Sequence, residues 1–173
     1  MTDTYPLVSI ITLNYNQSEL TLQLLQSLQQ LSYPNIEILV CDMNSRDEES
    51  SKLEGIAFRN TKVLFSEINR GFAGGNNWGI QQSNGEYILL LNNDTVVEPN
   101  LVTSLLTPLN RSETIAAVSP KIRQFYNREM IEYAGFNPIN YYTGRTSSIG
   151  YNEVDQPGFN TARETASVHG CAV

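Results

Sequence analysis

Three polar residues, Asn92, Asn93 and Asp94, directly follow the apolar run from Tyr87 to Leu91. Such a run is typical of a buried strand, and here it stops at two amides and a carboxylate. Carboxylate and amide oxygens are ligands that Mg²⁺ and Mn²⁺ prefer, and Mg²⁺ is usually held by one or two carboxylates together with substrate phosphates. Asn and Asp also favour ordinary turns, because their side chains bond the nearby backbone. The triplet alone therefore leaves a metal site and a plain turn both open.

A glycine-rich stretch, GFAGGNNWG, runs from Gly71 to Gly79. Glycine permits close approach of the backbone to a ligand, and the N-terminus of a helix favours anions. The stretch is neither GxGxxG nor a P-loop, because no Gly-Lys-Ser/Thr follows. It predicts a loop that leads into a helix at about Asn76, either as part of a phosphate site or simply as a flexible connection.

Two further side chains could contact a nucleotide. Asp42 closes the apolar run from Ile36 to Cys41, where a carboxylate can accept hydrogen bonds from a base NH or a ribose hydroxyl, or can cap the following loop. Tyr15 could stack on a base or be an ordinary half-buried aromatic residue. His169, the only histidine, has no neighbouring ligand set and is predicted to be structural.

The elements that must position these residues alternate along the first two-thirds of the chain. Apolar periodicity and turn residues predict strands at 7–13, 36–41, 62–66, 87–91 and 115–119, and helices at 19–31, 50–58, 76–83 and after Glu98-Pro99, with Ser18 capping the first helix. This alternation favours an α/β fold with a mainly parallel sheet flanked by helices. In such sheets ligands bind beyond the carboxyl ends of the strands, so a site is expected at the segments just after them: Asn14 to Asn16, Asp42 to Ser45, Asn69 to Gly75, and Asn92 to Thr95.

Composition excludes several classes of protein. The chain has 173 residues and a net charge of −7, with no run of Lys or Arg, so a nucleic-acid partner gains no support. Cys41 and Cys171 form no metal-spaced pair and are expected to be reduced, in a cytoplasmic setting. The N-terminus shows no secretion signal, and no apolar run approaches the roughly 20 residues that span a bilayer.

The C-terminal part has a different texture. After Pro120 the chain is rich in Tyr, Gly, Asn and Pro with weak periodicity, and it ends on the apolar run SVHGCAV. A domain seldom stops inside a strand, so we expect a single domain over residues 1–173 whose C-terminal part is missing. Residues 1–95 would form its nucleotide-binding half and residues 96–173 the start of its acceptor half.

Taken together, these stretches resemble the inverting nucleotide-sugar glycosyltransferases of the large bacterial family with a GT-A fold, most closely its rhamnosyltransferase-type members. VSIITLNYNQ looks like that family's opening strand. Tyr33 to Ser50 is similar to its "YPN-x-E-I-x-V-x-D-N-x-S-x-D" stretch, with Met43 in place of a polar residue. Asn69 to Thr95 is similar nearly throughout to its "N-x-GFAGGNN-x-G … GEYILLLNNDT" signature. The resemblance is strong over about residues 7 to 110.

The resemblance implies roles for individual residues. It assigns Tyr15 and Asp42 to the base and ribose of the donor, and it places the triplet at 92–94 on the DXD motif that holds a divalent metal, Mg²⁺ or Mn²⁺, and the donor diphosphate. Asp94 becomes the principal metal ligand, because Asn92 replaces the first Asp of that motif. The other residues that we expect in the donor site are Asn44, Gly74, Asn77 and Asn93.

The function that the resemblance implies is transfer of a sugar, with inversion, from a UDP- or dTDP-sugar to a hydroxyl of a saccharide or lipid-linked acceptor. The product would be a surface polysaccharide made at the cytoplasmic face of the membrane. The family's catalytic base lies in an acidic motif beyond a strand that SVHGCAV resembles, so the base is expected after Val173. Two alternatives stay open. One is a non-catalytic module of the same fold that binds a nucleotide sugar without turnover or serves as an interaction domain; the other is a dinucleotide-dependent oxidoreductase, which the missing GxGxxG disfavours.

Overall fold

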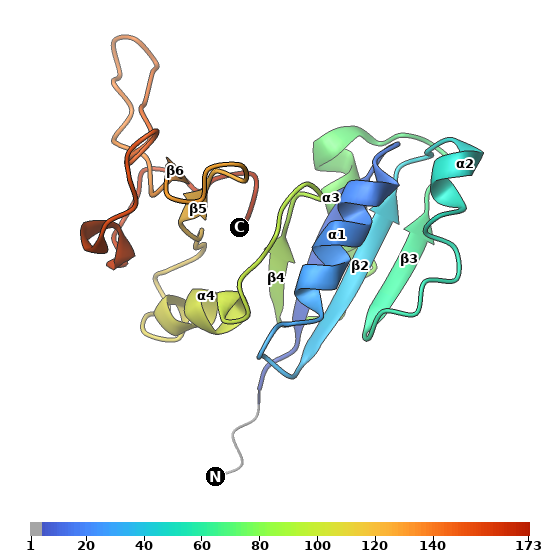
Figure 1. Cartoon of the computed structure of the whole chain (residues 1–173). Coiled ribbons are helices and arrows are strands. Elements are labelled where there is room, and N and C mark those ends of the chain that lie inside the picture. Colours follow the sequence, from blue (N-terminus) through green and yellow to red (C-terminus); the bar gives the residue numbers. More distant parts are fainter. Residues whose placement is uncertain (1–4) are drawn as a thin grey trace. The chain divides into compact units, whose positions relative to one another are not determined.

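The computed structural model describes residues 5–173, and these form two compact units, one that ends at Val102 and one that spans Thr103–Val173. The first unit is built on a four-stranded sheet in which every neighbouring pair is parallel. Its strand order is β3-β2-β1-β4, formed by β1 (Val8–Asn14), β2 (Ile36–Asp42), β3 (Thr61–Phe65) and β4 (Tyr87–Leu90) (Figure 1).

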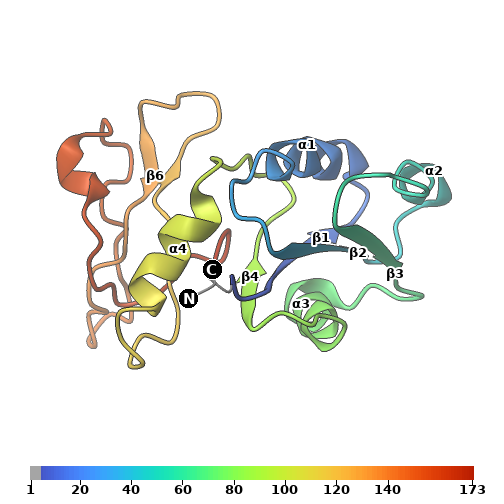
Figure 2. The same ribbon diagram turned by 90° about the horizontal axis from the view of Figure 1, so that it is seen from below.

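Helices cover both faces of this sheet. Figure 2 shows α1 (Ser18–Leu28) on one face and α3 (Gly71–Gln81) on the other. The α1 helix turns its leucines inward, with Leu24, Leu25 and Leu28 buried. The α3 face of the sheet carries a second apolar cluster of Ile11, Leu39, Cys41 and Met43. Strands buried on both sides explain why β1 and β2 are apolar without alternation.

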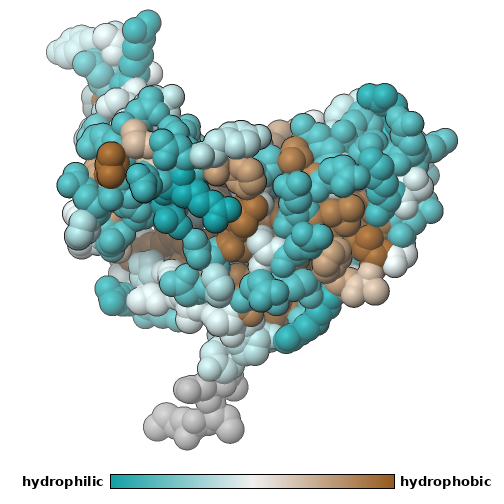
Figure 3. Space-filling view, viewed as in Figure 1, coloured by the Kyte–Doolittle hydropathy of each residue, from teal (hydrophilic) through white to brown (hydrophobic). Residues whose placement is uncertain are grey.

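The short helix α2 (Asp47–Ser50) follows β2 and carries three acidic residues in its first turn. Its surface is hydrophilic in the space-filling view of Figure 3. The helix expected at 50–58 is therefore wrong in position, because the residues after Ser51 form turns that end at Gly55, whose φ of 68° suits glycine.

The amino end of the sheet is fastened by one carboxylate. Glu37 Oε1 accepts hydrogen bonds from Ser9 Oγ at 2.5 Å and from the Asn84 backbone N–H at 2.6 Å. The Gly85 N–H donates to Ser9 Oγ at 2.7 Å, and a Cβ on Gly85 would come within 2.6 Å of the Ser9 backbone nitrogen. Glycine is therefore required at position 85, just before β4. Glu37 and Gly85 both lie in the stretches that carry the resemblance described above, and folding alone explains their presence there.

The second unit contains less regular structure. It holds most of α4 (Leu101–Leu109), the antiparallel pair β5 (Ile122–Arg123) and β6 (Ile131–Tyr133), and a 3₁₀ turn, η1 (Pro157–Asn160). Lys121 ties its segments together, since its Nζ lies 2.6 Å from Asp155 Oδ2 and donates to Asn160 Oδ1 at 2.6 Å. The strand expected at 115–119 is wrong, because these residues form no strand.

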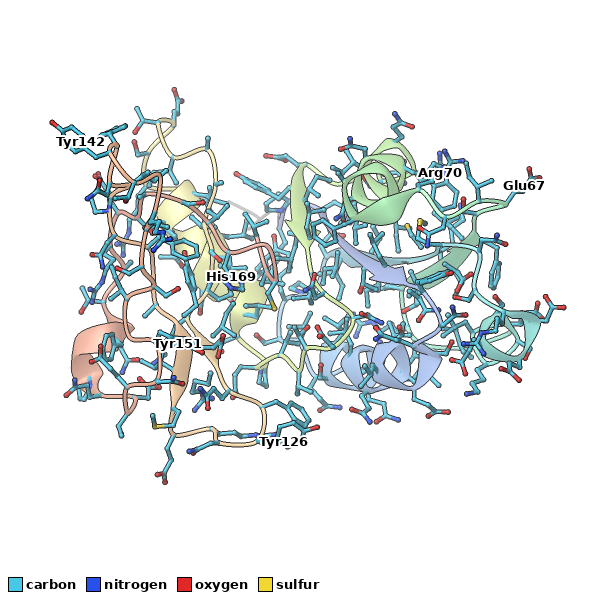
Figure 4. All side chains as sticks on the ribbon, turned by 90° about the horizontal axis from the view of Figure 1, so that it is seen from above. Glu67, Arg70, Tyr126, Tyr142, Tyr151 and His169 are labelled. Atoms are coloured by element: carbon cyan, nitrogen blue, oxygen red, sulfur yellow. The ribbon has the colours of Figure 1, made fainter. Side chains whose placement is uncertain are left out.

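His169, predicted to be structural, packs among aromatic rings in this second unit. Its ring lies 4.9 Å from that of Tyr133 and 6.1 Å from that of Phe136, measured between centroids. Its Nδ1 accepts a hydrogen bond from the Cys171 backbone N–H at 3.2 Å. Figure 4 labels His169 together with three exposed tyrosines of the same unit, Tyr126, Tyr142 and Tyr151.

Candidate functional site

The carboxyl ends of the two central strands meet at a pair of polar side chains. Asn14 ends β1 and is in register with Asp42, which ends β2. Asn14 Nδ2 donates to Asp42 Oδ2 at 2.7 Å, and both residues are buried on the face of the sheet that carries α1. Two polar side chains that end adjacent buried strands thus form the floor of a candidate site, at the edge where parallel sheets bind ligands.

Asp42 is held by further donors from the loop that follows it. Its Oδ1 accepts the Ser45 N–H at 2.9 Å and Ser50 Oγ at 3.3 Å, and the residue is only 1% exposed. A buried carboxylate needs such partners, because an unpaired charge is costly to bury. Asp42, which was predicted to lie in the nucleotide-sugar site, therefore fixes the loop that carries Asn44. The Asn44 side chain is exposed, and its backbone has a φ of 62°.

A second loop, after β1, is tied to the first. The Asn16 N–H donates to Ser45 Oγ at 2.8 Å, while Asn16 Oδ1 accepts the Arg46 N–H at 2.9 Å. Asn16 itself has a φ of 55°, a conformation that Asn tolerates better than most residues. Tyr15 lies on this fixed loop with half of its surface exposed, so its ring is available for stacking on a planar group.

The triplet after β4 forms a turn at the same edge of the sheet. Thr95 Oγ1 donates to the carbonyl oxygen of Asn92 at 2.7 Å, and Asp94 is exposed on the turn. Asn93 points to the α1 side, where its Nδ2 donates to Thr21 Oγ1 at 3.1 Å. The structure thus makes the triplet a turn and at the same time leaves the Asp94 carboxylate facing solvent.

The donor set suits a weakly held divalent metal. Within residues 5–173 no three His, Cys, Asp or Glu side chains come close enough to hold a metal by themselves. Asp94 offers one exposed carboxylate with the Asn92 amide two residues away. Such a set fits Mg²⁺ or Mn²⁺ only when substrate phosphates complete the coordination. The residues present therefore fit a metal that arrives with a diphosphate.

The glycine-rich stretch is helical from its first glycine, so the expected helix start at Asn76 is wrong. Gly75 and Gly79 lie against the sheet, where a Cβ would come within 2.9 Å of Met43 Sδ and 2.5 Å of Ile11 Cγ2, respectively. These glycines serve close packing of helix on sheet, and that packing overrides their low helix propensity. Gly74 sits one turn after Arg70, with its Cβ position 3.2 Å from Arg70 Cβ.

Two further polar side chains of this region are Asn77, within α3, and Arg70, the residue that precedes the helix. Asn77 is exposed, on the side of the helix away from Gly75 and Gly79, whereas its neighbour Asn76 is buried. Arg70 precedes the helix and lies over the Trp78 ring at 5.3 Å, with its Nε donating to Ser66 Oγ at 3.2 Å. Figure 4 shows Arg70 at the beginning of α3. A fixed guanidinium near a helix N-terminus adds positive charge to this edge.

The N-terminus of α1 is held by a carboxylate instead of the predicted serine cap. The helix begins at Ser18 itself, and Ser18 Oγ donates to the Glu49 carbonyl oxygen at 2.7 Å. Glu49 Oε2 accepts the Ser18 N–H at 3.0 Å. The hydrogen bond from Lys52, together with that from Ser18, lowers the pKa of Glu49. The charged form of Glu49 therefore joins α2 to the start of α1.

The sequence pattern placed Asn14 and Ser45 only within the segments that follow the first two predicted strands, without a role of their own, and it missed Thr21; the structure brings all three together at the centre of the site. Thr21 carried the clearest signal. It falls on the buried face of α1 with Leu24, Leu25 and Leu28, and a polar residue in that apolar phase needs a polar partner.

Comparison with known proteins identifies the family of the chain. The family model described as "Glycosyl transferase family 2" matches residues 9–169. An uncharacterized glycosyltransferase of Haemophilus influenzae is 27% identical over 141 residues, which cover 80% of this chain and 42% of the relative. A poly-beta-1,6-N-acetyl-D-glucosamine synthase of Staphylococcus epidermidis is 30% identical over 119 residues, or 67% of this chain and 29% of the relative. The chain thus spans less than half the length of these relatives.

Solved structures share the fold. A mannosyltransferase of Pyrobaculum calidifontis, PcManGT, in complex with GDP-Man and Mn²⁺, superposes with a TM-score of 0.64 at 21% identity, covering 86% of this chain and 45% of that one. Residues 1–349 of S. aureus TarS in complex with UDP give a TM-score of 0.54 at 26% identity, covering 61% and 32%.

These neighbours and the parallel sheet with helices on both faces confirm the predicted α/β fold of GT-A type. Because the family model covers nearly the whole of the described chain, the protein belongs to glycosyl transferase family 2 and is a glycosyltransferase domain.

Proposed function

We propose that the protein transfers a sugar from a nucleotide-diphosphate donor to an acceptor hydroxyl with inversion, in the manner of the rhamnosyltransferase-type enzymes that it resembles. The observation that carries this proposal is the exposed Asp94 carboxylate at the same sheet edge as the Asn14–Asp42 pair and Tyr15. A nucleoside group and a diphosphate are the two halves of such a donor. The edge offers Tyr15 and Asn44, on loops that Asp42 holds, to the first half and Asp94 to the second.

Each predicted residue has a task in this scheme. The Tyr15 ring stacks on the base, and Asn44 offers its exposed amide to the ribose or the base, while Asp42 keeps both loops in place. Asp94 would hold the metal, with Asn92 as a neutral second ligand. When bound there, a divalent metal would neutralise charge that develops on the leaving diphosphate.

The α3 side of the site contributes positive potential. The N-terminus of α3 and the Arg70 guanidinium attract the negative diphosphate, and Gly74 lets the backbone approach it closely. Asn77 offers its exposed amide to the part of the sugar donor that extends along the outer side of α3. Asn93 holds the turn after β4 in place, because its side chain donates a hydrogen bond to Thr21 of α1.

The acceptor and its activation belong to the proposal for the longer protein. An acidic base after Val173 would take the proton of a saccharide or lipid-linked hydroxyl, which then displaces the nucleotide at the anomeric carbon. A relative named poly-beta-1,6-N-acetyl-D-glucosamine synthase supports a role in polysaccharide synthesis. That the product is a surface polysaccharide, made at the cytoplasmic face of the membrane, is part of the proposal. No helix among residues 5–173 is long and apolar enough to cross a bilayer.

Titration calorimetry with UDP, dTDP and GDP, each with and without Mn²⁺, tests the donor site. GDP joins the panel because a structural neighbour was solved with GDP-Man. We expect one nucleotide to bind more tightly when Mn²⁺ is present, and Asp94→Ala to remove that gain. The matched control is Glu86→Gln, an exposed carboxylate at the opposite end of the same strand. Absence of metal-dependent binding in the wild type would refute the proposal.

A second candidate is binding of a nucleotide sugar without turnover. It is motivated by Asn92, because a neutral amide at this position weakens metal affinity relative to a carboxylate. Asn92→Asp distinguishes the two functions. If the full-length protein transfers the sugar and Asn92→Asp increases the rate of transfer, the protein is an enzyme. If both forms bind the nucleotide sugar and neither transfers it, the protein is a binding module.

A further inference from the structure

A directed chain of hydrogen bonds joins the two ends of the candidate site beneath its surface. Asn93 Nδ2 donates to Thr21 Oγ1 at 3.1 Å, and Thr21 Oγ1 donates to Asn14 Oδ1 at 2.8 Å. Asn14 Nδ2 in turn donates to Asp42 Oδ2 at 2.7 Å. The three bonds link the turn after β4, helix α1, strand β1 and strand β2, and every one of them points toward the Asp42 carboxylate.

The chain is buried where it matters. Asn14 and Thr21 are fully buried and Asp42 is 1% exposed, so water does not compete for their bonds. Bonds that all point the same way polarise one another, and the terminal carboxylate strengthens the donors behind it. The geometry of one bond therefore depends on the next.

Thr21 carries the only hydroxyl among the four side chains of this hydrogen-bond relay, and it joins Asn93 to Asn14. Its oxygen accepts a hydrogen bond from the Asn93 amide, and its O–H donates one to Asn14 Oδ1. The Thr21 hydroxyl has a second possible acceptor, the Gln17 carbonyl oxygen, but that distance is 3.3 Å and is longer than the one to Asn14 Oδ1. Valine has nearly the same shape as threonine but can neither accept nor donate, so it would cut the chain at its centre.

We infer that Thr21 is a positioning residue that couples the metal and diphosphate end of the donor site, through Asn93, to the nucleoside end, through Asn14 and Asp42. The inference rests on the proposed function. The Asp94 turn is set in register with the Asp42 loop by this bond chain, although no backbone hydrogen bond of the sheet joins β4 to β2, since β1 lies between them.

The test compares three variants. Thr21→Val cuts the chain and Thr21→Ser retains its hydroxyl. Thr12→Val is the matched control, because Thr12 is an equally buried threonine of the same unit whose Oγ1 has no hydrogen-bond partner among the described residues. Calorimetry measures the dissociation constant of whichever of UDP, dTDP and GDP binds the wild type most tightly, with and without Mn²⁺.

Thr21→Val removes two hydrogen bonds of the relay but none to the ligand itself, so we expect it to weaken binding of the Mn²⁺–nucleotide by about fivefold to tenfold. Thr21→Ser and Thr12→Val should stay within about twofold of the wild type. Asn93→Ala should weaken binding in the wild type and have no further effect in Thr21→Val, because Asn93 acts through Thr21. Unchanged binding in Thr21→Val, or losses that add in full, would overturn the inference.

A second measurement needs no nucleotide. The Ser45 backbone N–H bonds Asp42 Oδ1, and its amide resonance therefore reports on the far end of the chain. Thr21→Val should shift this resonance and the Asn93 side-chain amide more than Thr12→Val does. A Ser45 amide that does not respond would overturn the coupling even if nucleotide binds. If the relay responds but no nucleotide binds the wild type, the proposed function fails and takes with it the donor-site role of Thr21.

Discussion

Gly79→Ala introduces a single methyl group where α3 lies closest to the sheet. An ideal Cβ at Gly79 would be 2.5 Å from Ile11 Cγ2 and 3.1 Å from Cys41 Sγ. Ordinary contacts begin at 3.4 Å, so the helix or Ile11 must move by almost 1 Å. Ile11 is β-branched, fully buried and in a central strand, and its stiff side chain cannot turn away easily.

Two opposing effects set the magnitude. In a solvated helix interior, Ala is more favourable than Gly by about 1 kcal/mol. Overpacking a filled core costs about 1–3 kcal/mol, and the short distance to a rigid neighbour places Gly79→Ala at the upper end. We therefore expect a net loss of about 2 kcal/mol in the free energy of unfolding.

Urea denaturation of the wild type and the variant measures this loss. Gly74→Ala is the matched control, since its Cβ would meet only Arg70 Cβ of the preceding turn, at 3.2 Å. Its stability should stay within about 1 kcal/mol of the wild type. In an Ile11→Ala background, where the obstructing methyl is gone, the cost of Gly79→Ala should largely vanish. A Gly79→Ala protein as stable as the wild type would refute this account of the glycine-rich helix.

Three further predictions concern buried groups. Burial raises the pKa of Glu37, but hydrogen bonds from Ser9 and Asn84 outweigh it and lower the pKa below its ordinary value; Glu37→Gln should therefore cost about 1 kcal/mol near pH 7, and denaturation at a series of pH values should show the difference shrinking below about pH 4 as the wild-type carboxylate is protonated. Burial raises the pKa of the Cys41 thiol to about 12, so in a Cys171→Ser background a thiol reagent at pH 8 should modify only unfolded protein, and rapid labelling of the native form would contradict this burial. Thr12→Val removes a buried hydroxyl that has no partner among the described residues and should raise the free energy of unfolding by about 1 kcal/mol; a loss of stability would reveal a partner that the structure does not show.

Much of the first unit could be predicted from its sequence. The apolar runs that became β1 and β2 were found to within a residue at each end, because a strand buried on both faces leaves an unambiguous pattern. The placement of Asp42 and the 92–94 triplet at one edge of the sheet followed from the parallel topology alone. Local pattern and global fold agree for these segments.

The features that the sequence did not predict correctly have a common physical cause, because contacts between distant parts of the chain determine each of them. The glycines of α3 argue against a helix until the close packing at Gly75 and Gly79 is known. Ser18 has the composition of a cap, yet its hydroxyl bonds α2 instead. The importance of Thr21 depends on Asn93, 72 residues away, and no local pattern contains such a contact.

The central claim, that the carboxyl edge of the sheet binds a metal–nucleotide, is tested most directly by paramagnetic broadening of backbone amide signals with Mn²⁺ and UDP. We expect signals of residues 92–95 and of Asn44 to disappear first, and those of Asn84 and Gly85 at the opposite edge to persist. Asp94→Asn should abolish the selective broadening, while Glu86→Gln should leave it unchanged. Broadening centred elsewhere on the chain, or equal in wild type and Asp94→Asn, would contradict the claim.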